Sequence, residues 1–157
     1  MSEETKYLVR LSADTAILAV IGRAGYMNCR NVGDFFTTAI DNGCKNLLVQ
    51  CRECTGMDST FLGMITSASL KLRKIGGTIT LLNLSERNQE LIENLGLSKL
   101  VKTLSIDENT STDSTLESTA TPSADILSAH ESLVEANSAN LAKFQDVIAF
   151  LKKDNEK

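Results

Sequence analysis

Residues 55–64, TGMDSTFLGM, separate two segments of different character and decide how the rest of the chain is interpreted. Before them, residues 46–51 read NLLVQC, a nearly unbroken apolar block typical of a strand buried on both faces of a sheet. After them, apolar residues recur with the period of a helix at Phe61, Ile65, Ala68, Leu72 and Ile75. The polar residues Asp58, Ser59 and Thr60 therefore lie at a turn from a strand into a helix.

The segments on either side repeat this alternation. Strand-like runs lie at residues 7–9, 15–21, 78–84 and 100–106, and helix-like runs lie at residues 32–40 and 85–95. The order is strand, strand, helix, strand, helix, strand, helix, strand, which predicts an α/β fold with a mostly parallel sheet and crossover helices. Functional residues of such sheets gather at the carboxyl ends of the strands. The turn at Asp58 is predicted to lie at such an end.

The composition excludes several classes of function. Apolar residues make up 42% and charged residues 23% of the 157-residue chain, as in ordinary soluble proteins. A net charge of -4 and 4% aromatic residues argue against nucleic-acid binding and against attraction to an anionic membrane. The first ten residues lack the basic start and apolar stretch of a secretory signal, and no run approaches the roughly 18 apolar residues of a membrane helix. We therefore expect a cytoplasmic protein.

The reactive residue types do not form an enzyme or metal motif. Cys51 and Cys54 form a lone CxxC, but a zinc site needs a second ligand pair and a redox pair needs a helix N-terminus. We expect buried or strand-end thiols, with no metal and no cofactor. A nucleophilic Ser59 needs a base, and the single histidine, His130, lies beyond a polar segment. The G-x-S-x-G turn and the clustered glycines of a phosphate-binding loop are also missing, so we expect no enzymatic activity.

The last third of the chain differs from the rest. Residues 1–106 hold the predicted domain, and residues 107–122 are rich in Ser, Thr and acidic residues, which predicts a flexible linker. Residues 123–157 predict an amphipathic helix with a heptad repeat of Leu127, Val134, Leu141 and Ile148. Its apolar stripe must contact the domain, a second copy in a homodimer, or a partner. We expect this contact to leave Ser59 free and His130 exposed or at the edge of the stripe.

Two interpretations of the turn at Asp58 remain open. In the first, Asp58 or Ser59 caps the second helix, which stabilises a helix by about 1 kcal/mol. Three consecutive side chains that accept hydrogen bonds exceed what one cap needs, and a hydroxyl in a first helical turn is a good phosphate acceptor. The helix N-terminus favours the added charge of about -1.5 to -2.

The run from residue 57 to residue 101 resembles the STAS domain of bacterial anti-sigma-factor antagonists. The family has an Asp-Ser-[Ser/Thr]-Gly-Leu-Gly turn that opens a helix, a Gly-Gly strand entry, and a Gly-Leu before the last strand. The matching residues here are Asp58-Ser59-Thr60, Leu62-Gly63, Gly76-Gly77 and Gly96-Leu97. The resemblance covers roughly residues 6–106. Phe61 stands where the family usually has Gly, so it either enlarges the contact surface or belongs to the core stripe.

This resemblance implies a STAS-like mixed sheet and a protein-binding switch. In the family, the Ser after the Asp is phosphorylated by a partner that is both serine kinase and anti-sigma factor, and a phosphatase reverses the reaction. Carried over, Ser59 is the phosphoacceptor, and the predicted partner-binding residues are Met57, Asp58, Ser59, Thr60, Leu62 and Gly63. The alternative is a non-switching STAS adaptor or structural subunit of a larger complex, in which Ser59 serves only as a helix cap.

Overall fold

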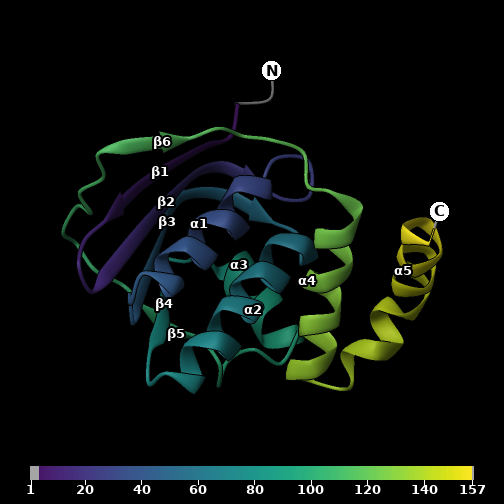
Figure 1. The fold of residues 1–157 in the computed structure, drawn as a ribbon. Helices are drawn as coiled ribbons and strands as arrows, with labels where there is room; N and C mark the ends of the chain where they lie inside the picture. Colours follow the sequence, from purple (N-terminus) through teal and green to yellow (C-terminus); the bar gives the residue numbers. More distant parts are fainter. Residues whose placement is uncertain (1–3, 157) are drawn as a thin grey trace.

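A six-stranded mixed sheet is the framework of the protein, which a computed structural model describes for residues 4–156 (Figure 1). The strand order is β5-β4-β3-β2-β1-β6. The strands are β1 (Lys6–Leu11), β2 (Thr15–Ala24), β3 (Asn46–Met57), β4 (Thr78–Leu82), β5 (Lys102–Leu104) and β6 (Ser114–Leu116). Neighbouring strands from β2 to β5 pair in parallel, whereas β1 pairs antiparallel with β2 and with β6. The predicted mostly parallel sheet is confirmed.

Three crossover helices connect the parallel strands, as the sequence predicts. They are α1 (Arg30–Asp41), α2 (Ser59–Lys74) and α3 (Glu86–Asn94). Ser85 caps α3 by accepting a hydrogen bond from the Asn88 backbone N–H at 3.2 Å. The Asn88 side chain is buried without a partner for its amide atoms, so only half of a capping box forms.

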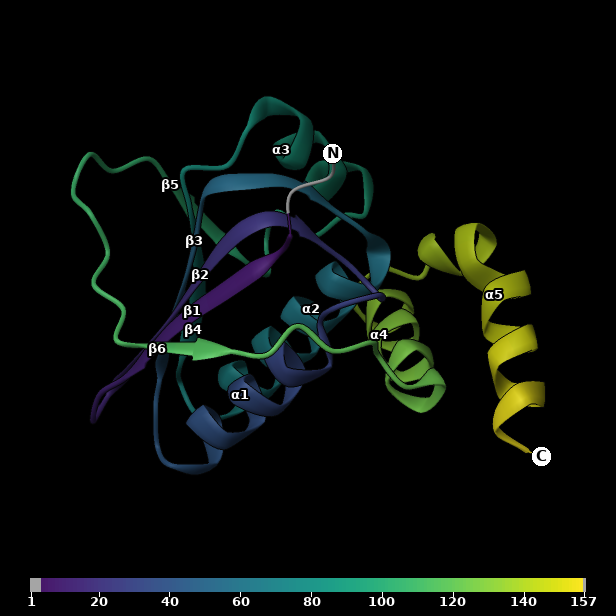
Figure 2. The ribbon, with the colours of Figure 1, turned by 90° about the horizontal axis from the view of Figure 1, so that it is seen from above.

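The main core lies between the sheet and the layer formed by α1 and α2 (Figure 2). Its fully buried side chains come from alternate positions of the strands and from one side of α2, and include Leu18, Leu47, Ile65, Leu72, Ile79 and Leu81. The opposite face of the sheet is covered less completely. Leu48, which points to that face from the middle of β3, is only half-buried. The prediction of a strand buried on both faces was therefore too strong.

The segment predicted to be a flexible linker is held against the sheet. Its first part crosses the partly open face, where the Arg52 guanidinium donates to the Asn109 side-chain oxygen at 3.2 Å. Its middle forms β6, which adds an edge strand beside β1. Its last part is fixed to α1, because the Asn31 side-chain amide donates to the carbonyl oxygen of Glu117 at 2.8 Å. Polar and backbone hydrogen bonds order this segment, although it has little apolar surface to bury.

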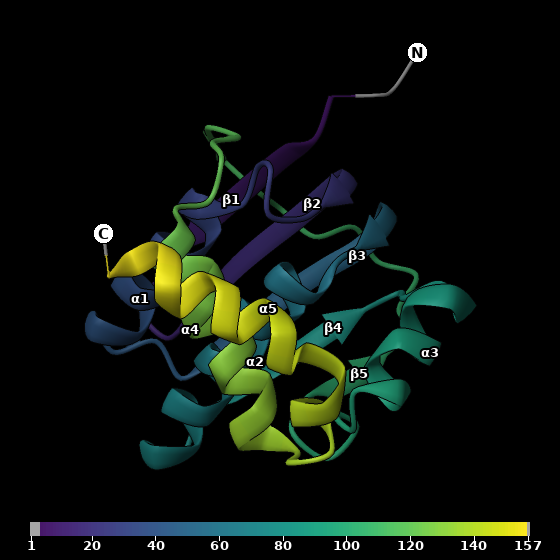
Figure 3. The same ribbon diagram turned by 90° about the vertical axis from the view of Figure 1, so that its right-hand side faces the viewer.

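The predicted single C-terminal helix is two helices, α4 (Ser123–Ala136) and α5 (Asn140–Asn155). Together they are called the helical tail below. Helix α4 packs on the side of α2 that faces away from the sheet, and α5 packs on α4 as the outermost layer (Figures 2 and 3). The heptad stripe does not form a continuous buried line, because Leu127 and Val134 are half-buried and Leu141 is exposed.

The paired glycines after α2 allow a prediction about stability. A Cβ at Gly77 would lie 2.5 Å from the carbonyl oxygen of Lys45, which is held in place by the Thr78 N–H at 2.8 Å. Gly76 has a φ of +76° and open space around it. We expect Gly77→Ala to lower the free energy of unfolding by about 1–3 kcal/mol through crowding. Chemical denaturation measures this change.

The neighbouring position supplies the control for this prediction. Asn is the side chain that best tolerates the left-handed backbone of Gly76, so Gly76→Asn should cost less than about 1 kcal/mol. Equal losses for the two variants would mean that close contact with Lys45 does not determine the requirement for glycine at residue 77.

Candidate functional site

The turn between β3 and α2 is fixed by the carboxylate of Asp58. Its Oδ1 accepts from the backbone N–H of Phe61 at 3.0 Å, which makes Asp58 the N-cap of α2. Its Oδ2 accepts from the backbone N–H of Tyr26 at 2.8 Å and so joins α2 to the loop after β2. A Cβ at Gly25 would lie 2.4 Å from this oxygen, so the loop can pack this closely against Asp58 only because residue 25 is glycine. The capping interpretation is confirmed for Asp58.

With Asp58 as the cap, Ser59 is the first residue of α2, at the carboxyl end of β3 as predicted. Its side chain is half-buried, and its Oγ lies 2.8 Å from the Nε2 of His130 in α4. The His130 Nδ1 lies 2.8 Å from the carbonyl oxygen of Ile126 and must donate, because a carbonyl only accepts. In the neutral imidazole Nε2 is then the acceptor, and the Ser59 hydroxyl donates to it.

His130 is the residue at this site that the sequence did not reveal. It is 4% exposed, and Phe144 of α5 packs edge-on against its ring at a centroid distance of 5.0 Å. The expectation of an exposed or stripe-edge histidine was therefore wrong. A polar interruption of the apolar stripe was the only sequence signal, and it did not indicate a partner 71 residues away.

The Ser59–His130 hydrogen bond links the start of α2 to α4. The His130 Nδ1 proton is donated to the carbonyl oxygen of Ile126 within α4, which orients Nε2 toward Ser59, and Phe144 of α5 packs against the imidazole ring. The geometry supports a hydrogen bond that holds α4 on α2.

Helix α4 also contacts part of the predicted partner-binding surface. A Cβ at Gly63 would lie 2.3 Å from the carbonyl oxygen of Ala129, so the two helices touch through their backbones. Met57, Thr60 and Leu62 are buried, with 6%, 3% and 1% of their surfaces exposed. The expectation that the docked helix leaves the Ser59 surface free was wrong. The six residues run from the last residue of β3, Met57, to the start of α2, and two of them, Ser59 and Gly63, contact α4 directly.

Phe61, the departure from the family motif, is a core residue. It is fully buried and stacks on Tyr7 of β1 with a centroid distance of 6.5 Å and an interplanar angle of 14°. The aromatic side chain therefore points toward the sheet, on the opposite side of α2 from α4. Of the two interpretations left open by the sequence, the core position is confirmed, and Phe61 does not enlarge the outer surface.

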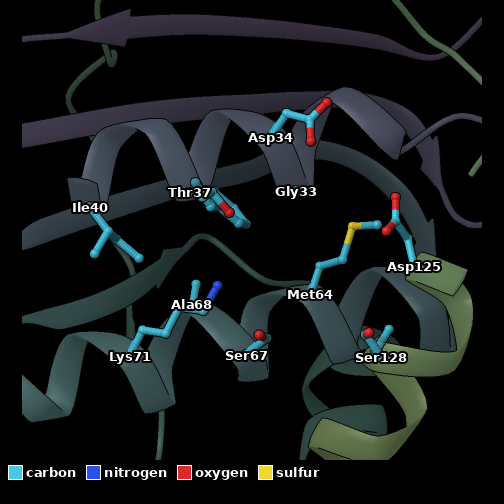
Figure 4. A pocket seen from close by; sticks show the side chains of 12 residues that line it. Gly33, Asp34, Thr37, Ile40, Met64, Ser67, Ala68, Lys71, Asp125 and Ser128 are labelled. Carbon is cyan, nitrogen blue, oxygen red and sulfur yellow. The ribbon is translucent and has the colours of Figure 1, made fainter. Parts of the chain in front are cut away.

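A cavity of about 150 Å³ lies where α1, α2 and α4 meet (Figure 4). Thr37 and Ile40 line it from α1, Met64 and Lys71 from α2, and Asp125 and Ser128 from α4. The cavity shows that α4 does not fill the groove between the two crossover helices. It is separate from the Ser59–His130 contact, whose residues do not line it.

The CxxC cysteines lie within β3, where the strand continues to Met57. All four cysteines are free and buried. Burial raises the pKa of Cys29 to about 11 and raises the pKa of Cys51 and of Cys54 above the ordinary value of 9.0. Among residues 4–156, no group of three His, Cys, Asp or Glu side chains is arranged to hold a metal ion.

These features define a mixed α/β domain that presents a hydroxyl at the N-terminus of a helix. The chain belongs to the STAS-domain family, because the family model described as "Mlab, STAS domain" matches residues 8–102. The matched part contains the sheet from β2 to β4, the three crossover helices and most of β1, and it ends before β6 and the helical tail. No curated protein matches the sequence significantly.

Solved structures with the same fold include anti-sigma factor antagonists. Unphosphorylated SpoIIAA is 17% identical, with a TM-score of 0.56 over 65% of this chain and 89% of that one. Phosphorylated SpoIIAA of Bacillus is 16% identical, with a TM-score of 0.56 and coverage of 65% and 92%. An antagonist from Mycobacterium paratuberculosis is 15% identical, with a TM-score of 0.55 and coverage of 66% and 90%. At these identities the likeness establishes the fold.

Within the part of the chain that the structure describes, none of the helices has both the length and the apolar character needed to span a membrane.

Buried thiols lead to a prediction about reactivity and pH. At pH 8 the native protein should react with iodoacetamide far more slowly than the urea-unfolded protein, because the thiolate is the reactive species and burial disfavours it. Mass spectrometry counts the modified cysteines in each state. Rapid native labelling of Cys51 and Cys54 would instead restore a redox interpretation of the CxxC.

The sign of the pH dependence follows from the raised pKa. Cys29 ionises near pH 9 in the unfolded chain and near pH 11 in the folded one. Its contribution to stability is therefore complete below pH 9 and is lost as the pH rises toward 11. The free energy of unfolding of the wild type should fall over this range, and Cys29→Ala should show a shallower fall.

Proposed function

We propose that this cytoplasmic protein is an anti-sigma factor antagonist that works as a phosphorylation-controlled binding switch, with Ser59 as its phosphoacceptor. The observation that carries the proposal is the position of Ser59. It is the first residue of the helix after β3 and follows the capping Asp58, on a fold shared with SpoIIAA in its unphosphorylated and phosphorylated forms. The partners would be a serine kinase that is also the anti-sigma factor, and a serine phosphatase.

The electrostatics of the turn support a switch. The N-terminus of α2 favours a phosphate because its amide dipoles point toward it. Asp58 lies next to Ser59, so phosphorylation would place a phosphate beside a carboxylate at the centre of an interface. Like-charge repulsion and desolvation there cost several kcal/mol, which is enough to open a micromolar complex.

Thr60 does not compete well as an acceptor. It is 3% exposed, whereas Ser59 is half-buried and its hydroxyl is held only by the hydrogen bond to His130. The 2.8 Å between Ser59 Oγ and His130 Nε2 leaves no space for a phosphoryl group between the two atoms, so their hydrogen bond must open when Ser59 is modified.

The second candidate function, a non-switching STAS adaptor, is favoured by that same hydrogen bond. A hydroxyl that permanently holds α4 in place has a structural role and needs no kinase. The two functions differ in whether Ser59 ever carries a phosphate.

Phosphorylation at Ser59 can be tested in the native cell. We expect the purified protein to contain a fraction with one added phosphate, and site mapping should place it on Ser59. Thr60→Val should retain the phosphate, whereas Ser59→Ala should lose it. Absence of phosphate under every growth condition would favour the adaptor, and an unchanged phosphate on Ser59→Ala would place the site elsewhere.

The effect of charge on binding can be isolated with two substitutions of similar size. Ser59→Asp should bind the co-purifying partner at least tenfold more weakly than Ser59→Asn, a difference of about 1.4 kcal/mol. Both substitutions remove the serine hydroxyl, so the comparison reports the charge alone. Calorimetry gives the affinities and circular dichroism checks the fold. Equal affinities for the two variants would contradict a charge-operated switch.

A further inference from the structure

The outer face of α2 is built to receive a helix at very short distance. Gly63 has no side chain, and this allows Ala129 of α4 to pack directly against the α2 backbone. A Cβ added at Gly63 would lie only 2.6 Å from the Ala129 Cβ. One turn further along α4, Leu133 is fully buried. This face of α2 therefore fits a helix that has a small residue at the crossing point and an apolar residue four positions later.

Polar contacts in the middle of α4 and at the start of α5 hold the helical tail in place. In the middle of α4 the His130 Nε2 lies 2.8 Å from the Ser59 hydroxyl oxygen. At the start of α5 the Asn140 side-chain amide donates to the carbonyl oxygens of Leu95 at 2.9 Å and Leu133 at 2.8 Å, and Lys143 donates to the carbonyl oxygen of Asn94. Each such hydrogen bond contributes little net free energy, because hydrogen bonds to water replace it when it opens. The polar contacts fix the position of α4 without making it permanent.

The attachment of α4 to the domain allows it to leave. The chain is anchored just before α4, where the Thr121 backbone N–H donates to the Tyr26 carbonyl oxygen at 2.8 Å and the Thr121 hydroxyl lies 3.2 Å from the Cys29 sulfur. Pro122 follows with an extended backbone and connects this anchor to the helix. A pocket of about 150 Å³ also lies beside α4, where it meets α1 and α2, so α4 does not fill the groove between those two helices.

We propose that the outer face of α2 is a helix-binding surface, that α4 is its resident intrachain occupant, and that a partner binds by presenting an amphipathic helix in the place of α4. The partner helix carries Gly, Ala or Ser against Gly63, an apolar residue one turn later, and a hydrogen-bond acceptor beside Ser59. That the partner is the kinase and anti-sigma factor rests on the function proposed above. The exchange of helices itself does not depend on it.

The tail sequence supplies the probe for this surface. A fluorescein-labelled peptide of residues 121–156 is titrated into the full-length protein, and binding is followed by fluorescence anisotropy. Wild type should bind it weakly, because α4 already covers α2. Full-length Leu133→Asp should bind it at least tenfold more tightly, because a buried carboxylate expels α4 while the α2 surface is unchanged.

Three controls locate the binding event. Full-length Glu135→Ala, changed at an exposed position of α4, should bind as weakly as wild type. A peptide that itself carries Leu133→Asp should not bind. Adding Gly63→Leu to the Leu133→Asp protein should abolish peptide binding, because a side chain there occupies the crossing point.

The proposal is overturned if Leu133→Asp releases α4 and the peptide still binds no better than to wild type. Release is measured by hydrogen exchange, which should speed up in α4 and α2 and stay slow in β3. Should Leu133→Asp unfold the domain, Ala129→Leu provides the second variant, since its larger side chain collides with α2 at Gly63. No kinase or phosphate enters these measurements, so their outcome is independent of whether Ser59 is ever phosphorylated.

Discussion

Helix α2 is covered on two opposite sides, by the sheet and by α4, and the rest of the structure depends on this double burial. Phe61 and Leu72 point toward the sheet, and Gly63 faces α4, so the helix has almost no free surface along its first three turns. The carboxylate of Asp58 fixes where α2 begins and thereby sets the positions of both faces. A change that shifts this start moves the Ser59 hydroxyl, the Gly63 crossing and the core together.

The sheet-facing half of this arrangement could be predicted from the sequence. Strand lengths, the helical period of the stripe from Phe61 to Ile75, and the polar turn at Asp58 were sufficient for the fold and for the position of Ser59. The second buried face also left a trace. Residues 59–70 contain no charged side chain, which is typical of a helix covered on more than one side. Periodicity alone hides this signal, because it reports only the more apolar of two buried faces.

The segment after β5 could not be predicted for a different reason. Composition measures how much apolar surface a segment can bury, and residues 107–122 have little. Their order comes from β6 pairing with β1 and from side-chain hydrogen bonds such as that of Asn31 with Glu117. Such bonds depend on which groups meet in three dimensions. The contact of His130 with Ser59 was inaccessible for the same reason, since no local pattern connects residues so far apart in the chain.

An intrachain occupant of a binding surface changes how that surface responds. A tethered helix acts at an effective concentration on the order of millimolar, so a partner must compete with it even when the helix binds weakly. Every 1.4 kcal/mol by which the docked arrangement is favoured lowers the apparent affinity of the partner about tenfold. The hydrogen bond between Ser59 and His130 belongs to the docked arrangement alone, so any change at Ser59 alters the competition as well as the surface. Phosphorylation would thus act twice, by opening the hydrogen bond to His130 and by adding charge beside Asp58. The two effects have opposite signs for partner binding. The charge must therefore outweigh the release of α4 if phosphorylation is to weaken the complex.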